Sequence, residues 1–204
     1  MNREELLKNI EHRISARRLK HTMGVEKVAI ELAKAYGSDQ DKASLAALLH
    51  DIAKPYTPEE AVALGKSLGI EYDEYELFEP ALLHGPLGAA IAGKEFGITD
   101  RDILCAIEFH TTGRKNMTLL EKIIYIADLI EPSRDFEGLE LIQKLSKKDL
   151  DAAMQAALRR EIVHVMECSC LLYTSQHLFH LIDLLRQILI HILFKDPHHS
   201  KLLC

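Results

Sequence analysis

Five segments of this chain place a histidine or an aspartate on an apolar helical stretch or at its end. The most informative is ALLHDIAK at 47–54, where His50 and Asp51 follow apolar residues and Lys54 comes three positions later. Imidazole and carboxylate groups suit divalent metals such as Fe, Mn or Zn. Adjacent helical residues point about 100° apart, so both reach one metal only near a helix end or through a bridging carboxylate. Alone, the pair is weak evidence, because such dipeptides often lie on a surface.

Four further residues extend this pattern along the chain. His21 lies in RLKHT, His84 in LLHGP and His110 in EFHTTG, each next to an apolar stretch. Asp128 lies in the apolar run IIYIADLI, where a lone carboxylate is costly to bury without a metal, a cation or several donors. Taken singly, each histidine is more often a hydrogen-bonded helix residue, and Asp128 could cap a helix or pair with Arg134. Their common setting favours one shared metal site.

The elements that must position these residues are helices throughout. Capping boxes at 57–60 and 118–121 begin two of them, and Ser38 and Thr99, each with Asp three residues later, carry a weaker start signal. No alternation of apolar and polar residues is long enough to predict a strand. We therefore expect a compact all-α bundle with no domain boundary before about residue 168. The predicted helices span 3–14, 16–36, 39–54, 58–68, 80–96, 100–110, 119–131, 139–146 and 149–167.

Composition narrows the range of partners. Apolar residues make up 48% of the 204 positions and Trp is absent, which is typical of a helical protein with a sizeable core. The net charge of -6 argues against nucleic acid, which needs a basic face, whereas a small anionic substrate can rely on metal charge. The four cysteines form no CxxC pair, and the first residues resemble no signal peptide, so we expect a cytoplasmic protein with reduced thiols.

The tail at 168–204 differs in character from the rest of the chain. Residues 177–194 place Leu and Ile on one broad face, which predicts an amphipathic helix for packing or for a homodimer. Charged and polar residues interrupt this stretch, so we expect no membrane span. A frameshifted or spliced end is the alternative interpretation, and we place no chemistry there.

The ordered set His, His-Asp and Asp resembles the HD superfamily of metal-dependent phosphohydrolases. Several longer motifs are similar to those of the bacterial YqeK-type symmetrical diadenosine tetraphosphatases. They are RxxHT at 18–22, ALLHDIAK at 47–54, HG at 84–85, FHTTG at 109–113 and IADLIEPSR at 126–134. The similarity covers about residues 1–167, which we expect to form an HD phosphohydrolase domain, followed by an atypical tail at 168–204.

The resemblance implies two metal ions that share one ligand. One set is His21, His50, Asp51 and Asp128, and the other is His84, His110 and the bridging Asp51. It further implies that the metals are iron, divalent or mixed-valence, although these ligand types also accept Mn, Co or Zn. The implied reaction is symmetrical hydrolysis of diadenosine tetraphosphate, a small-molecule dinucleoside polyphosphate, to two ADP.

Groups beside the ligand motifs are candidates for contact with the substrate. With Asp51, we predict Lys54 and Arg134 as catalytic residues that neutralise phosphate charge, and both also as substrate ligands. The alternative for these two cations is ordinary helix-end charge. The remaining predicted substrate ligands are Arg18, Thr111, Thr112 and Gly113.

Two other functions stay open at this point. One is a different HD nucleotide phosphohydrolase, although the Gly-Tyr-Pro tripeptide of the cyclic dinucleotide esterases is absent. The other is a non-catalytic, metal-dependent nucleotide-sensing module, against which the intact set of candidate ligands argues. The products of turnover would distinguish these alternatives.

Overall fold

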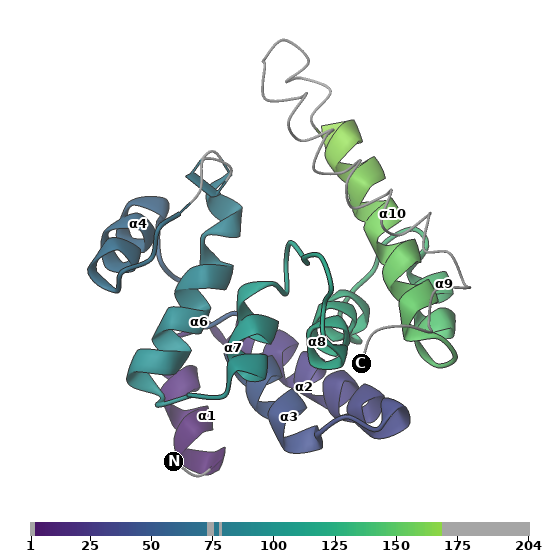
Figure 1. The fold of residues 1–204 in the computed structure, drawn as a ribbon, viewed down its shortest axis with the longest axis horizontal. Helices are drawn as coiled ribbons and strands as arrows, with labels where there is room; N and C mark the ends of the chain where they lie inside the picture. Colours follow the sequence, from purple (N-terminus) through teal and green to yellow (C-terminus); the bar gives the residue numbers. More distant parts are fainter. Residues whose placement is uncertain (1–2, 73–75, 78, 169–204) are drawn as a thin grey trace, which may run out of the picture. The chain divides into compact units, whose positions relative to one another are not determined.

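The computed structural model describes residues 3–72, 76–77 and 79–168, and every regular element within these ranges is a helix (Figure 1). The all-α prediction is therefore confirmed for the described part of the chain. The elements are α1 Arg3–Glu11, α2 Ala16–Tyr36, α3 Gln40–Leu49, α4 Pro58–Ser67, the 3-10 helix η1 Pro80–Leu82, α6 His84–Glu95, α7 Arg101–Glu108, α8 Leu119–Ile130, α9 Leu139–Ser146 and α10 Leu150–Cys168.

Five helices of the first compact unit, residues 1–154, carry the candidate site. Helix α2 packs against α3 and α8, while α7 packs against α6 and α8, and α3 contacts both α7 and α8 (Figure 1). Large apolar side chains fill the space between these helices and are almost completely removed from solvent. They include Leu48, Leu49, Leu87, Ile91, Ile107, Ile123, Ile124 and Ile126.

Helix starts follow local capping chemistry. The two capping boxes predicted at the starts of α4 and α8 are confirmed. The starts predicted at Ser38 and Thr99 are wrong by one residue, because Asp39 and Asp100 are the N-caps. Each of these carboxylates accepts hydrogen bonds from two backbone amides of the first turn, and its negative charge also suits the positive end of the helix.

Several predicted helices are shorter than expected: those predicted over 3–14 and 100–110 end at Glu11 and Glu108, and two others end or break within the predicted range. The helix predicted over 39–54 ends at Leu49, and the chain continues through hydrogen-bonded turns before α4. The helix predicted over 80–96 is interrupted at Leu83, where η1 ends and α6 begins. Both interruptions fall beside candidate ligands, so those side chains project from helix ends rather than from helix interiors.

The second compact unit begins at residue 155, within α10, and extends to the end of the chain. The amphipathic helix predicted at 177–194 lies outside the described residues. Among the described helices, none combines the length and the apolar character needed to cross a bilayer.

Candidate metal centre

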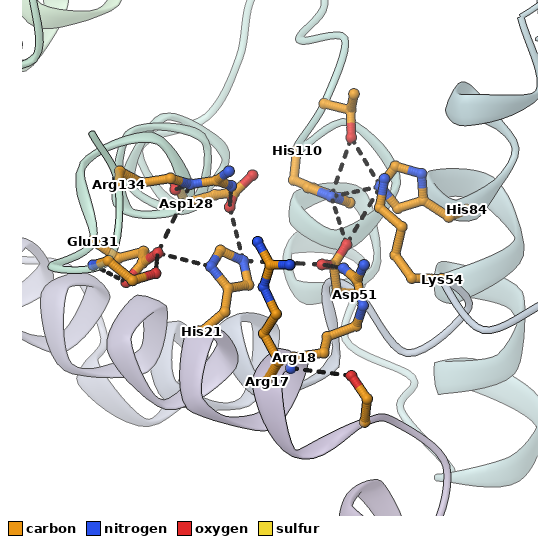
Figure 2. Close-up of a pocket in the computed structure, with 13 residues that line it drawn as sticks. Arg17, Arg18, His21, Asp51, Lys54, His84, His110, Asp128, Glu131 and Arg134 are labelled. Atoms are coloured by element: carbon orange, nitrogen blue, oxygen red, sulfur yellow. Dashed lines mark hydrogen bonds and ion pairs between the residues drawn. The ribbon is translucent and has the colours of Figure 1, made fainter. Parts of the chain in front are cut away.

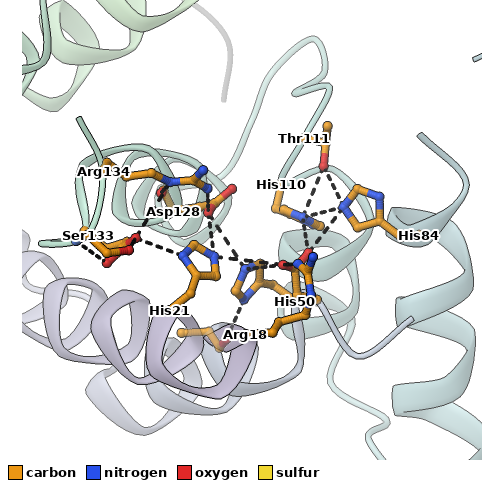
Figure 3. Close-up of polar contacts among 12 residues, drawn as sticks. Arg18, His21, His50, His84, His110, Thr111, Asp128, Ser133 and Arg134 are labelled. Carbon is orange, nitrogen blue, oxygen red and sulfur yellow. Dashed lines mark hydrogen bonds and ion pairs between the residues drawn. The ribbon is translucent and has the colours of Figure 1, made fainter. Parts of the chain in front are cut away.

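The six predicted ligands converge on one place in the first unit (Figure 3). They come from the second turn of α2, the end of α3 with the turn after it, the first residue of α6, the residue beyond the C-cap of α7, and the last turn of α8. In chain order they are His21, His50, Asp51, His84, His110 and Asp128.

Asp51 lies between two groups of histidines and presents one carboxylate oxygen to each. Its Oδ2 atom is 3.9 Å from Nε2 of His21 and 3.7 Å from Nε2 of His50. Its Oδ1 atom is 3.5 Å from Nε2 of His84 and 3.7 Å from Nε2 of His110. His50 is the C-cap of α3, so the adjacent pair lies at a helix end, and the two oxygens of the Asp51 carboxylate face both groups of histidines. These are the two conditions under which both residues could serve one centre.

The remaining distances within the cluster are short as well. Oδ1 of Asp128 is 3.1 Å from Nε2 of His21 and 3.9 Å from Nε2 of His50. The Nε2 atoms of His84 and His110 lie 3.0 Å apart. Metal–ligand bonds of about 2.1 Å at right angles place two ligand atoms about 3 Å apart, so the two shortest of these distances would suit atoms around a common ion.

Hydrogen bonds to backbone carbonyls orient three of the histidines. Each uses its Nδ1 atom to reach the carbonyl oxygen three residues earlier, and a carbonyl can only accept, so Nδ1 carries the proton. The Nε2 atom then keeps a free lone pair and faces the cluster. The bonds run from His50 to Ala47 at 2.6 Å, from His84 to Ala81 at 2.6 Å and from His110 to Ile107 at 2.7 Å.

His50 provides the clearest indication that the cluster fits a metal. Its side chain is fully buried, and its Nε2 atom has no hydrogen-bond partner among the residues that the structure describes. An unsatisfied buried acceptor costs roughly 1–3 kcal/mol. A cation bound between the surrounding imidazoles and carboxylates would satisfy this atom, so the residues fit such a group.

The protonation states also suit a cation. Burial, with the nearby His110 and Lys54 charges, lowers the pKa of His84 to about 3, and burial likewise lowers the pKa of His50. Burial alone would raise the pKa of Asp51, but the imidazoles of His50 and His110 hold this pKa well below its usual range. Near neutral pH, His84 and His50 are therefore neutral and Asp51 is ionised, the forms that bind divalent metals. His21 differs, because burial alone would lower its pKa, but its hydrogen bonds with Asp128 and Glu131 outweigh burial and raise this pKa.

A glycine brings the second pair of histidines together. A Cβ atom at Gly85 would lie 2.4 Å from the backbone carbonyl oxygen of Glu108, closer than real atoms approach. The absence of a side chain at Gly85 lets the start of α6 approach the end of α7. His84 directly precedes Gly85 and His110 lies two residues after Glu108, so this close contact helps to set the distance between their rings.

A cavity of about 620 Å³ opens over the cluster (Figure 2). Of the predicted substrate residues, Arg18, Lys54, Thr111 and Arg134 line it, which is a suitable arrangement for an anionic ligand. Thr112 and Gly113 do not line it, and their role in substrate binding stays a prediction. Residues that also line the cavity but were not predicted from the sequence are Ser15, Arg17, Glu131 and Ser133.

The cations of the cavity pair with the candidate ligands or stand beside them. Arg18 forms an ion pair with Oδ2 of Asp51. Arg134 donates from Nη2 to Oδ1 of Asp128 at 2.5 Å and from Nε to the backbone carbonyl of the same residue at 2.9 Å. Burial lowers the pKa of Lys54, a half-buried residue at the other side of the cavity (Figure 2).

The missed residues differ in how visible they were in the sequence. Arg17 precedes Arg18 in the first turn of α2, so the run of two arginines was an available signal. Glu131 follows the apolar run of α8 and is only 1% exposed. The cost of burying a carboxylate, which drew attention to Asp128, applies equally to Glu131 and could have identified it.

Comparisons with known proteins agree with this site. Residues 18–133 match the HD domain. The symmetrical bis(5'-nucleosyl)-tetraphosphatase of Halalkalibacterium halodurans is 43% identical over 167 residues, which cover 82% of this chain and 89% of the relative. The enzyme of the same name from Bacillus subtilis is 42% identical over 169 residues, with the same coverage of both chains.

A solved structure has the same fold. The crystal structure of a predicted HD superfamily hydrolase involved in NAD metabolism from Clostridium acetobutylicum superimposes with a TM-score of 0.80 at 39% identity, covering 83% of this chain and 89% of that one. The chain belongs to the HD domain family of metal-dependent phosphohydrolases. The family resemblance carried by the sequence motifs is thereby confirmed.

Proposed function

We propose that this protein hydrolyses diadenosine tetraphosphate symmetrically to two ADP in the cavity above Asp51. The main support is the position of the Asp51 carboxylate, whose two oxygens face two separate sets of histidines. Such an arrangement suits a pair of metal ions that share one bridging ligand. The tetraphosphatases that are 42% and 43% identical to this chain support the choice of substrate.

In this proposal the two metals are iron. His21, His50, Asp51 and Asp128 would hold one, and Asp51, His84 and His110 would hold the other. When bound, such a pair lowers the pKa of water and neutralises charge on a reacting phosphoryl group. Mn, Co or Zn would fit the same ligand types.

The cations of the cavity account for binding of a long polyphosphate. Arg134 lies on the side of His21, Lys54 lies on the side of His84, and Arg17 and Arg18 lie between them (Figure 2). Cleavage at the centre of a tetraphosphate leaves a nucleoside diphosphate arm on each side of the reacting bond. Positive side chains on both sides of the cluster can therefore hold both arms, with arginine binding phosphate in a bidentate manner and lysine acting as a point charge.

Thr111 supplies a neutral polar group next to the candidate ligands. Its hydroxyl lies 3.1 Å from Nε2 of His84 and 3.1 Å from Nε2 of His110. From this position the hydroxyl can donate a hydrogen bond to a phosphate oxygen that enters the cavity. Because both of these imidazoles belong to the site and the hydroxyl is uncharged, Thr111 would orient the substrate rather than neutralise its charge.

Product identification tests the proposal. The metal-loaded protein, incubated with diadenosine tetraphosphate, should yield ADP as the sole product. AMP with ATP would mean asymmetric cleavage, and turnover of other nucleotides only would favour a different HD phosphohydrolase. Tight nucleotide binding without turnover would favour the nucleotide-sensing module.

Several finer expectations stay predictions. They are a domain division near residue 168, a homodimer formed through the tail, action in the cytoplasm, and independence from nucleic acid and membranes. None of them enters the chemistry proposed for the cavity.

A further inference from the structure

The four histidines of the cluster are not oriented in the same way. Three of them donate from Nδ1 to a neutral backbone carbonyl of their own helix or turn. Of the four, His21 is the one whose Nδ1 atom meets a carboxylate, since it lies 2.9 Å from Oε1 of Glu131, 110 positions away in the chain. The hydrogen bond joins the second turn of α2 to the residue after α8 (Figure 2).

We propose that Glu131 is a positioning residue that orients His21 and selectively strengthens the metal site on the His21 side of Asp51. This inference rests on the metal binding in the proposed function but not on the identity of the nucleotide. A carboxylate behind a ligating imidazole fixes its tautomer and raises its basicity, and loss of such a partner typically lowers metal affinity by about 10–100-fold.

The carboxylate of Glu131 is itself held firmly. It is 1% exposed, and its Oε2 atom accepts a hydrogen bond from the backbone N–H of Ser133 at 2.8 Å. The hydroxyl of Ser133 also donates to Oε1, and Nε of Arg134 lies 3.8 Å from the same atom. All of these neighbours are donors or cations, so they stabilise the anionic form of Glu131 and orient it toward His21.

A glycine in α2 independently points to the same contact. A Cβ atom at Gly24 would lie 2.7 Å from Oε2 of Glu131 and 3.5 Å from Cδ of Pro132. Glycine inside a helix costs about 0.5–1 kcal/mol relative to alanine. At position 24, the absence of a side chain leaves the space that the buried carboxylate of Glu131 occupies beside His21. This contact gives a reason for a glycine despite its cost to the helix.

Metal titration of the whole chain tests the proposal. Metal-free wild type and Glu131→Gln would be titrated with Mn²⁺ against a competing chelator, with no nucleotide present. Gln keeps the size and the acceptor oxygen of Glu131 but removes its charge. We expect one of the two sites to lose about 10–100-fold in affinity and the other to keep its wild-type value. At saturating Mn²⁺, kcat should largely recover, with KM for the dinucleotide unchanged.

Glu26 offers a matched control on α2. Its carboxylate is 4% exposed and, like that of Glu131, is bound by an arginine and a serine, here Arg3 and Ser44. Glu26→Gln therefore removes a buried charge of the same kind away from the histidines. We expect it to lower thermal stability while both Mn²⁺ affinities stay at wild-type values.

Two further variants cover the case in which Glu131→Gln does not fold. Gly24→Ala displaces the carboxylate without changing its charge, and Ser133→Ala, at an exposed position, removes one of its donors. Both should weaken the same single site, with Ser133→Ala giving the smaller effect.

The outcomes separate the two proposals. Three outcomes would overturn the role of Glu131 and leave the proposed function standing. They are wild-type affinities in Glu131→Gln, equal weakening of both sites, and equal effects of Glu26→Gln and Glu131→Gln. Wild-type protein that binds no Mn²⁺, Fe²⁺, Co²⁺ or Zn²⁺ would overturn the proposed function and this inference together. Selective loss at one site supports both.

Discussion

The two sides of Asp51 are built by different means. The His21 side joins α2, α3 and α8 and contains several charges, because His21 and Arg134 each lie beside the carboxylates of Asp128 and Glu131. The His84 side joins the start of α6 to the end of α7, and its histidines are oriented by neutral carbonyls and a glycine contact. One side therefore depends on long-range charge pairs and the other on close backbone packing. Variants that alter charge or packing should distinguish the two sides.

Asp51→Ala should have the largest effect, because the two oxygens of the Asp51 carboxylate face the two sides. We expect both metals to be lost and kcat to fall on the order of 10³-fold or more, with the helical fold kept. Elemental analysis, ADP production and circular dichroism would measure these effects. Asp41→Ala, in the exposed first turn of α3, is the control and should keep full activity. Wild-type turnover in Asp51→Ala would refute the assignment of the bridging ligand.

His110→Ala should affect the His84 side selectively. We expect reduced occupancy of one metal and retention of the other, because the ligands on the His21 side stay in place. Metal counting by elemental analysis checks this result. Two metals bound at wild-type stoichiometry would contradict the division of ligands between the two sides.

Gly85→Ala tests whether backbone packing sets the His84 side. The new Cβ would meet the carbonyl oxygen of Glu108, so α6 must shift, and we expect a loss of about 1–3 kcal/mol in stability together with weaker binding of one metal. Gly93→Ala in the same helix is the control, because its Cβ would lie at an ordinary 3.6 Å from the nearest atom, the carbonyl oxygen of Ile98. Gly93→Ala should leave metal binding unchanged and raise stability by about 0.5–1 kcal/mol. Thermal melts and Mn²⁺ titration would measure both variants, and equal behaviour of the two would count against the contact.

The cations provide a smaller test of symmetry. If a central bond of the tetraphosphate is cleaved, its two nucleoside diphosphate arms lie on opposite sides of the cluster. Arg134→Gln and Lys54→Gln would then each remove the positive charge that faces one of these arms. We expect each to raise KM about 10-fold, equivalent to about 1.4 kcal/mol of binding. Arg17→Gln should have a weaker effect, and Lys20→Gln on the exposed surface of α2 should have none. Steady-state kinetics would show the comparison, and a KM effect confined to one side would argue against a substrate held at both ends.

Local chemistry made much of the molecule predictable. Helix positions, the capping boxes and the six ligand types depend on residues within one or two turns of each other, so the sequence reveals them. The predicted starts at Ser38 and Thr99 were wrong by one residue because aspartates stand beside them and cap the helices instead. The length of the helix predicted over 39–54 was wrong because turns, not helix, follow Leu49.

The sequence alone determined the identity of the six candidate ligands and the helices that carry them, because residue type and periodicity are local properties. Only the tertiary structure decided which oxygen of Asp51 faces which histidines, and that Glu131 stands behind His21 where Gly24 leaves room. These contacts join helices far apart in the chain, and their distances follow from how the helices pack. No local pattern encodes that packing, since a small rotation of α8 against α2 would place a different side chain beside His21.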